Sequence, residues 1–99
     1  MQEEILLRTE DVSATVLGLA VGEEVPWHHH TEITDHIVCL EGSIEVSVRS
    51  PEETAVLNPG QRHTVVNGRV HRVVNVGSGA AEYLIVQGIG KYDRIMGDA

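Results

Sequence analysis

The chain is short and acidic: it has 99 residues, of which 41% are hydrophobic, and a net charge of −8 from 15 acidic and 7 basic residues. This composition suits one small globular domain over residues 1–99 and argues against disorder. An acidic surface repels phosphate backbones and anionic lipids, so nucleic acid and membranes are poor partners. Cys39 has no second cysteine to pair with, and the acidic residues after Met1 are unlike the basic start of a secretion signal. We therefore expect a cytoplasmic protein.

Branched aliphatic residues must build the core, since the chain contains no Phe, two Tyr and one Trp. Such side chains favour pleated sheets. Alternation and turn residues predict strands, in chain order, at residues 12–21, 28–31, 35–40, 43–49, 54–57, 63–66, 70–76 and 82–87. The acidic N-terminus is expected to be solvated, and the residues from Lys91 onward to form a short helical turn or a tail. Turn signals every ~8 to 12 residues predict an all-β sandwich or barrel.

Short links between the strands carry turn residues. The Glu41-Gly42 link predicts that residues 43–49 form a hairpin with residues 35–40. Asn58-Pro59-Gly60 fits a type II turn, in which Pro and Gly take the two central positions. Asn67-Gly68 also indicates a tight turn.

Histidines are the most informative residues, and there are six of them. On a strand, His28 and His30 project from one face while His29 points to the other. Asp35 follows near the start of the next strand, and His71 is a more distant candidate. Neutral imidazoles with one carboxylate suit Fe, Mn, Ni, Co, Zn or Cu as divalent ions, and suit Ca poorly. On spacing alone, two histidines on a strand surface without an ion are an equally good interpretation.

The surrounding residues resemble the first motif of the cupin superfamily. Residues 22–42 read GEEVPWHHHTEITDHIVCLEG. Gly22, His28, His30 and Gly42 match that motif, and Asp35 stands at its Glu position.

Residues 60–75, which read GQRHTVVNGRVHRVVN, resemble the second cupin motif. Gly60, Gly68, His71 and Asn75 match it, and Val66 replaces its Pro. His63 and Asn67 offer the same His-x3-Asn spacing, but the glycine frame fails in that alignment. Two interpretations of His63 stay open: it lines the cavity, or it lies outside it.

This resemblance implies a single cupin jelly-roll barrel of eight or more antiparallel strands with one divalent transition metal per chain (Fe, Mn, Ni, Zn, Co or Cu). It implies that His28, His30 and His71 are ligands, together with the acidic position. Asp35 is one methylene shorter than the Glu of the family, which favours a site where it does not bind tightly. It is then either a weak fourth ligand or a catalytic general base. Glu32 is a competing carboxylate with a poorer fit to the motif.

Other residues have simpler expected roles. Cys39 shares its parity with Asp35 and should point into the barrel as a core residue, whereas His36 should face away. Val38 and Leu40 make the opposite face apolar too, so we expect a homodimer formed by packing sheet against sheet. Trp27 either forms a wall of the site or packs under the barrel rim.

The resemblance favours a metal-dependent enzyme acting on a small organic molecule, of the dioxygenase, isomerase, lyase or cyclase type. It does not choose among these reactions. One alternative is a cupin that binds or senses a small ligand without turnover. Another is a metal-free, epimerase-like cupin in which a His–Asp pair performs acid–base catalysis.

Overall fold

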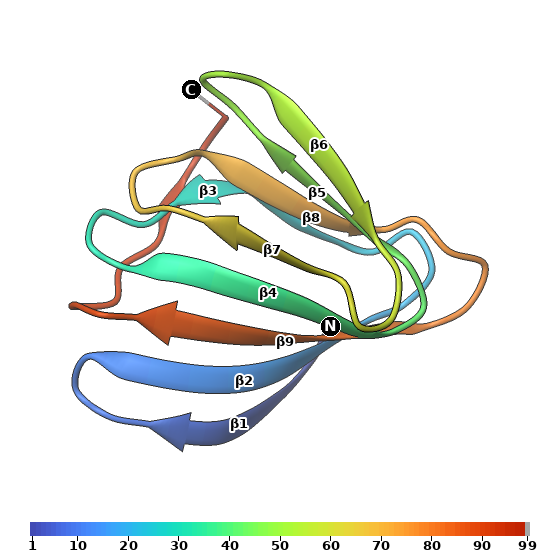
Figure 1. The fold of residues 1–99 in the computed structure, drawn as a ribbon, viewed down its shortest axis with the longest axis horizontal. Coiled ribbons are helices and arrows are strands. Elements are labelled where there is room, and N and C mark those ends of the chain that lie inside the picture. The colour runs from blue at the N-terminus through green and yellow to red at the C-terminus, as the bar shows by residue number, and fades with distance from the viewer. Residues whose placement is uncertain (99) are drawn as a thin grey trace.

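The computed structural model describes residues 1–98, which form two five-stranded antiparallel sheets that face each other (Figure 1). The first sheet has the order β1-β2-β9-β4-β7, and the second sheet has the order β10-β3-β8-β5-β6. The strands are β1 (Gln2–Arg8), β2 (Val12–Leu19), β3 (Glu24–His29), β4 (Thr34–Glu41), β5 (Ile44–Val48), β6 (Glu53–Leu57), β7 (Arg62–Val65), β8 (His71–Asn75), β9 (Ala81–Gly88) and β10 (Ile95–Met96). The all-β prediction is confirmed. Across residues 1–98, none of the chain forms a helix long and apolar enough to cross a membrane.

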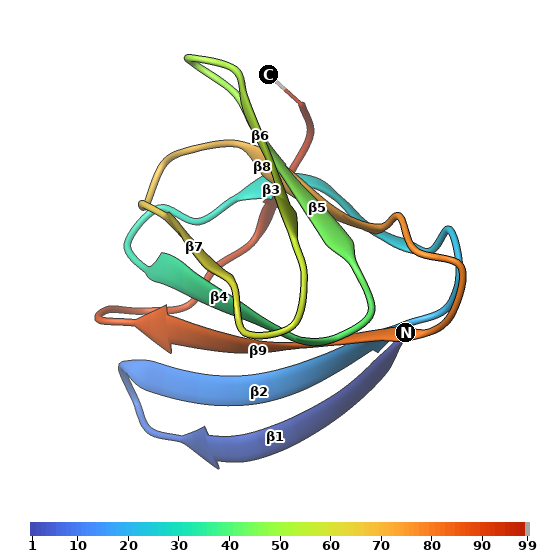
Figure 2. The same ribbon diagram turned by 45° about the vertical axis from the view of Figure 1, so that its right-hand side comes forward.

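A strand lies near each end of the described residues, which the sequence did not indicate. The seven residues of β1 are exposed as expected, yet they pair with β2 and extend the first sheet beyond the second (Figure 2). β10 pairs Ile95 with His29 and Met96 with His28, where a helical turn or a tail was expected. Backbone pairing needs only N–H and C=O groups, so these strands carry little apolar periodicity.

The predicted hairpin between residues 35–40 and 43–49 is wrong. β4 pairs with β7 and β9 in the first sheet, whereas β5 pairs with β6 and β8 in the second. The chain crosses between the sheets at Gly42, which has φ +74°, and a Cβ there would lie 2.8 Å from the carbonyl oxygen of Ala80. Glycine is needed at this crossing because no side chain fits against the neighbouring backbone.

The Asn58-Pro59-Gly60 turn between β6 and β7 forms as expected. The N–H of Gln61 donates to the carbonyl of Asn58 at 2.9 Å. Gly60 has φ +89°, the left-handed conformation that the third position of a type II turn requires.

The core fills the space between the two sheets. β5 contributes Ile44, Val46 and Val48, which are at most 2% exposed, and Cys39 is fully buried on the inner face of β4. The expected core position of Cys39 is confirmed, and burial raises the pKa of its thiol. Such burial leaves the thiol protonated and unreactive at neutral pH.

Asn75 closes the packed end of the barrel. Its side-chain amide donates to the carbonyls of Leu19, Ala20 and Gly79, and its Oδ1 accepts from the N–H of Gly77. Asn75 pairs with Ile44 at this end of β5, and His71 pairs with Val48 at the other. The two ends of β8 therefore have different functions: Asn75 joins loops of the barrel, and His71 faces the open end.

Candidate metal centre

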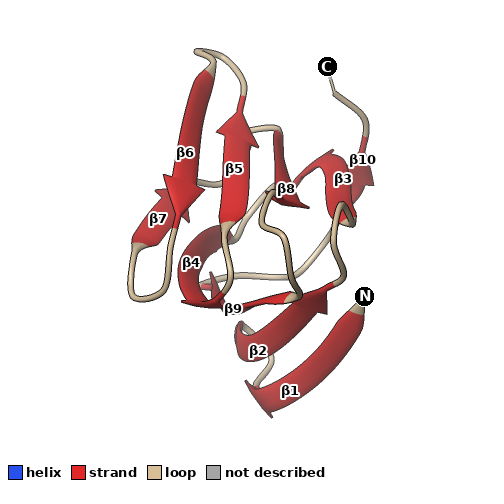
Figure 3. Cartoon of the chain, turned by 90° about the vertical axis from the view of Figure 1, so that its right-hand side faces the viewer, coloured by secondary structure: helices blue, strands red, loops and turns tan. Residues whose placement is uncertain are grey.

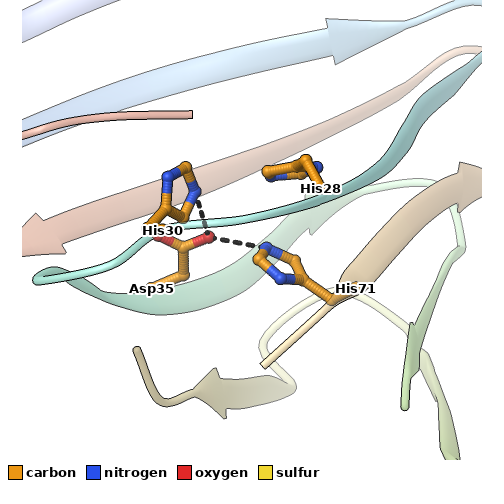
Figure 4. A group of neighbouring side chains, drawn as sticks. All are labelled: His28, His30, Asp35 and His71. Atoms are coloured by element: carbon orange, nitrogen blue, oxygen red, sulfur yellow. Dashed lines mark hydrogen bonds and ion pairs between the residues drawn. The ribbon is translucent and has the colours of Figure 1, made fainter. Parts of the chain in front are cut away.

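Four side chains from three strands and one loop meet inside the open end of the barrel (Figure 4). His28 lies on β3 and His71 begins β8, where the two residues are cross-strand partners. His30 directly follows β3, and Asp35 lies on β4 in the opposite sheet. One potential ligand atom from each residue lies within 4.8 Å of those of the others. The structure thus brings together all four residues that the sequence proposed.

The cluster is buried, with exposed fractions of 5% for His28, 3% for His30, 1% for Asp35 and 2% for His71. Alternation explains how His28 and His30 share a face although the register of β3 against β8 shifts between Val25 and His28. Buried ionisable groups are costly unless they are paired or bind a metal. The four buried side chains of the cluster therefore need either one another or a bound metal as partners.

Backbone carbonyls orient the three imidazoles. The carbonyl partners of Nδ1 are Pro26 for His28 at 2.7 Å, Arg69 for His71 at 2.9 Å, and Asp93 for His30. A carbonyl oxygen only accepts, so each Nδ1 must carry the proton. In a neutral ring the lone pair then lies on Nε2. Metal-binding histidines in proteins commonly donate such a hydrogen bond from the ring nitrogen that does not bind the metal.

Asp35 is held at both oxygens. Its Oδ1 accepts from Gln87 Nε2 at 3.0 Å, and its Oδ2 lies 2.9 Å from His71 Nε2 and 3.4 Å from His30 Nε2. Burial opposes ionisation of this carboxyl, but His30 and His71 outweigh it and hold the pKa of Asp35 well below its usual range. The short side chain therefore does not keep the carboxylate away from the histidines.

One buried nitrogen in the cluster lacks a partner. Among the described residues, His30 Nε2 makes no hydrogen bond, although Asp35 Oδ2 lies 3.4 Å away. An unpaired buried nitrogen of this kind requires an explanation. Three Nε2 atoms and one carboxylate match the donor set of a divalent transition metal, which would occupy that nitrogen. The residues present fit such an ion.

Burial also prepares His28 as a ligand. Desolvation lowers the pKa of His28 to about 4, and the nearby His71 and His30 act in the same direction. His30 behaves differently: burial disfavours its charge, but the adjacent Asp35 carboxylate outweighs this effect and raises the pKa of His30. His28 is consequently neutral at pH 7, which is the form that binds a metal.

The cluster lies in a cavity of about 520 Å³. Its wall includes Tyr83 and Gln87 from β9 and, from the segment after β9, Tyr92 and Arg94. Burial raises the pKa of Tyr83, and the Asp35 charge adds to this effect, so its phenol stays protonated. A cavity of this size holds a small organic molecule.

The remaining candidates lie outside the cluster. Glu32 is exposed and accepts a hydrogen bond from the N–H of Lys91 at 3.1 Å, so the structure does not place it with the histidines. His36 is exposed beside Thr64, as expected. His63 lies on β7, opposite Ile37 of β4, and is not among the described residues that line the cavity.

Trp27 is not among the described residues that line the cavity. The guanidinium groups of Arg49 and Arg72 lie over its ring, at 4.3 and 4.9 Å from the ring centroid. The face of an indole ring attracts cations, and here two guanidinium groups cover it on a half-exposed surface. The tryptophan therefore belongs to the second sheet rather than to the cavity.

Sequence reasoning missed Gln87, Tyr92, Asp93 and Arg94. All four lie after the second motif: Gln87 is near the end of the strand predicted at 82–87, and the other three follow in a segment without periodicity. The only available signal was the cluster of polar and aromatic residues at 91–94. Its link to the site depends on where the chain end folds.

Fold and site together define a small double-sheeted β-barrel with a buried His/Asp cluster that could hold a metal ion. The sequence model of the Cupin domain matches residues 15–87, which is well over half of the chain. The chain therefore belongs to the cupin family, as the two motifs indicated. No curated protein matches its sequence.

Solved structures share the fold at low sequence identity. An uncharacterized conserved protein with a double-stranded β-helix domain from Klebsiella pneumoniae has a TM-score of 0.86 and 20% identity, and the match covers 99% of this chain and 84% of that one. KdgF from Halomonas sp. has a TM-score of 0.81 and 19% identity, covering 91% and 79%. Oxalate oxidase has a TM-score of 0.80 and 20% identity, and the match covers 87% of this chain but only 46% of the oxidase.

Proposed function

We propose that the protein is a metal-dependent enzyme that acts on a small organic molecule in the barrel cavity. The observation that carries this proposal is the convergence of three imidazoles, each with Nδ1 fixed by a carbonyl, on one buried carboxylate. Folding such a cluster is costly without a ligand for it. The adjacent cavity of about 520 Å³ gives a substrate access to the same atoms.

His28, His30 and His71 would hold one divalent transition metal through Nε2. When bound, this ion would act as a Lewis acid or activate oxygen or water. Asp35 is either a fourth ligand or a general base that accepts a proton from the substrate. Gln87 fixes the carboxylate through Oδ1 in both cases, so Oδ2 stays directed at the histidines.

The reaction type is left open. Oxalate oxidase and KdgF share the fold at 20% and 19% identity, which transfers the architecture but no chemistry. Dioxygenase, isomerase, lyase and cyclase reactions all remain compatible with three histidines and one carboxylate.

Metal binding is the direct test of this proposal. Protein expressed with added Fe, Mn, Ni, Co, Zn or Cu is purified and analysed for metal content. We expect about one ion per chain, and at least a tenfold loss of affinity in His30→Ala. His36→Ala is the matched control, because His36 is exposed and outside the cluster. Equal metal content in wild type and His30→Ala would contradict the proposal.

The contact between His71 and Asp35 supports a second candidate function. A second proton, bound between Nε2 and Oδ2 across this 2.9 Å contact, would make the two residues the acid–base pair of a metal-free cupin. Turnover that survives complete chelation of metals would favour this candidate. A metal-loaded protein that binds small molecules without forming product would instead indicate a binding or sensing role.

A further inference from the structure

The segment after β9 forms a strap over the open end of the barrel, which we define as residues 89–97. The N–H of Gly90 donates to the carbonyl of Asp11, at the turn between β1 and β2. Further along, β10 pairs with β3, so the strap reaches from the first sheet to the second (Figure 3). The strap is therefore fastened at both ends.

Asp93 fastens the middle of the strap beside the metal centre. Its carboxylate accepts from the N–H of Thr31 at 2.8 Å and from the Thr31 hydroxyl at 2.6 Å. Its backbone carbonyl is the partner of His30 Nδ1. A single residue thus connects the position of the strap to the orientation of one candidate ligand.

The neighbours of Asp93 on either side line the cavity. The ring of Tyr92 lies 5.4 Å from that of His30, measured between centroids. Arg94 lines the same cavity as His28, His30 and His71. A small molecule in this cavity can therefore contact both the guanidinium and the histidine cluster.

Arg94 is a cation without a protein partner. It makes no ion pair or side-chain hydrogen bond within residues 1–98, although the chain has 15 acidic and only 7 basic residues. Arg49, Arg69 and Arg72, which lie outside the cavity, each have a carboxylate partner. Within residues 1–98, Arg8, which also lines the cavity, and Arg62, which does not, have none. A guanidinium is a planar fork of donors that matches a carboxylate.

We propose that Arg94 binds a carboxylate group of the substrate, so that the enzyme acts on small organic acids. The substrate would reach the metal centre with an oxygen at one end and contact Arg94 with its carboxylate at the other. The contact between the substrate and the metal rests on the proposed function. The contact between the substrate carboxylate and Arg94 does not depend on it. The carboxylates of Glu3, Glu10 and Asp11 also line the cavity, on β1 and the turn after it, and none of them pairs with Arg94. Asp11 contacts the start of the strap only through its backbone carbonyl.

A matched series of acids tests the proposal. Malonate, succinate and glutarate are titrated into the zinc-loaded protein by calorimetry, each beside its monoamide. The monoamide keeps one carboxylate for the metal and replaces the other with a neutral group of similar shape. For at least one chain length, we expect the diacid to bind about tenfold more tightly than its monoamide, as a charge-assisted hydrogen bond predicts.

Arg94→Gln should abolish the difference between diacid and monoamide while leaving zinc content unchanged. Lys91→Gln is the matched control, since it removes the same charge from the same strap and its side chain does not line the cavity. Equal affinities of diacid and monoamide in wild type would overturn the proposal. So would an equal loss in Lys91→Gln, or a loss that appears only in Arg8→Gln at the cavity rim.

The metal-free protein separates this proposal from the proposed function. We expect diacids, but not neutral diamides, to shift the NMR signals of backbone amides 90–94 in wild type and not in Arg94→Gln. If the chain binds no metal yet shows these shifts, the proposed function fails and the carboxylate site stands. If zinc binds at about one ion per chain and the shifts are absent, the carboxylate site fails alone.

Discussion

At the scale of single residues, the histidine cluster depends on which nitrogen of each ring is free. Carbonyl oxygens of Pro26, Arg69 and Asp93 occupy the three Nδ1 atoms, so the Nε2 atoms point to a common centre. The sequence indicated the ligand residues through their spacing. It could not indicate the carbonyl partner of His30, because Asp93 lies 63 residues away along the chain.

The low pKa of His28 predicts a pH dependence of stability in the metal-free protein. Because the folded-state pKa is about 4 and the ordinary value is 6.5, the unfolded chain binds this proton more readily. Its contribution is therefore fully present above pH 6.5, is lost as the pH falls toward 4, and amounts to about 3 kcal/mol. Urea unfolding of wild type and His28→Gln between pH 7.5 and ~4 measures it. A difference between the two proteins that does not change with pH would contradict the prediction.

At the scale of elements, the two glycines of the first motif are explained by different features of the structure. Gly22 and Gly42 share φ +74°. A Cβ at Gly22 would meet nothing within 4 Å, whereas one at Gly42 would lie 2.8 Å from the Ala80 carbonyl oxygen. The sequence resemblance located both residues. Only the crossing of the chain between the sheets explains why the second cannot be replaced.

This difference gives a matched pair of substitutions. We expect Gly22→Ala to lower the free energy of unfolding by about 1 kcal/mol, the cost of a left-handed backbone with a side chain. Gly42→Ala should lower it by about 3 kcal/mol, because the backbone of Ala80 must also move. Denaturant unfolding of the two variants under identical conditions checks this order. Equal losses would show that the close contact at Gly42 carries no energy.

The strap is the element that the sequence described least well. Residues 89–97 show neither alternation nor a helical period, and β10 has only two residues. Their structure comes from contacts with Asp11, Thr31 and β3, which are distant in sequence. Local patterns contain no information on such contacts, so Tyr92 and Arg94 were not recognised as cavity residues.

At the scale of the whole molecule, the outer face of the first sheet carries a row of apolar residues. Cross-strand partners project from the same side of a sheet, and the register aligns Val16, Leu84 and Val38 across three neighbouring strands. Glu4 lies at one end of this row and Arg62 at the other. In a twofold dimer with its axis parallel to the strands, Glu4 of each copy faces Arg62 of the other.

We therefore expect the homodimer indicated by Val38 and Leu40 to form through this face. Light scattering after size exclusion should give twice the chain mass for wild type and the chain mass for Val38→Glu, because the substitution buries an unpaired charge. Val56→Glu is the control, since Val56 is 51% exposed on the second sheet. A monomeric wild type at ~100 μM, or a dimer unaffected by Val38→Glu, would contradict the interface.

The sequence by itself determined the all-β class, the glycines of the two motifs and the residues of the candidate metal centre. Alternation reports which side chains share a face, and glycine reports where the backbone must turn. The tertiary structure alone decided that β4 and β5 belong to different sheets, that the carboxylate of Asp35 reaches His71, and that the strap covers the cavity. These features depend on burial and pairing between distant segments, and a local pattern of residues does not contain them.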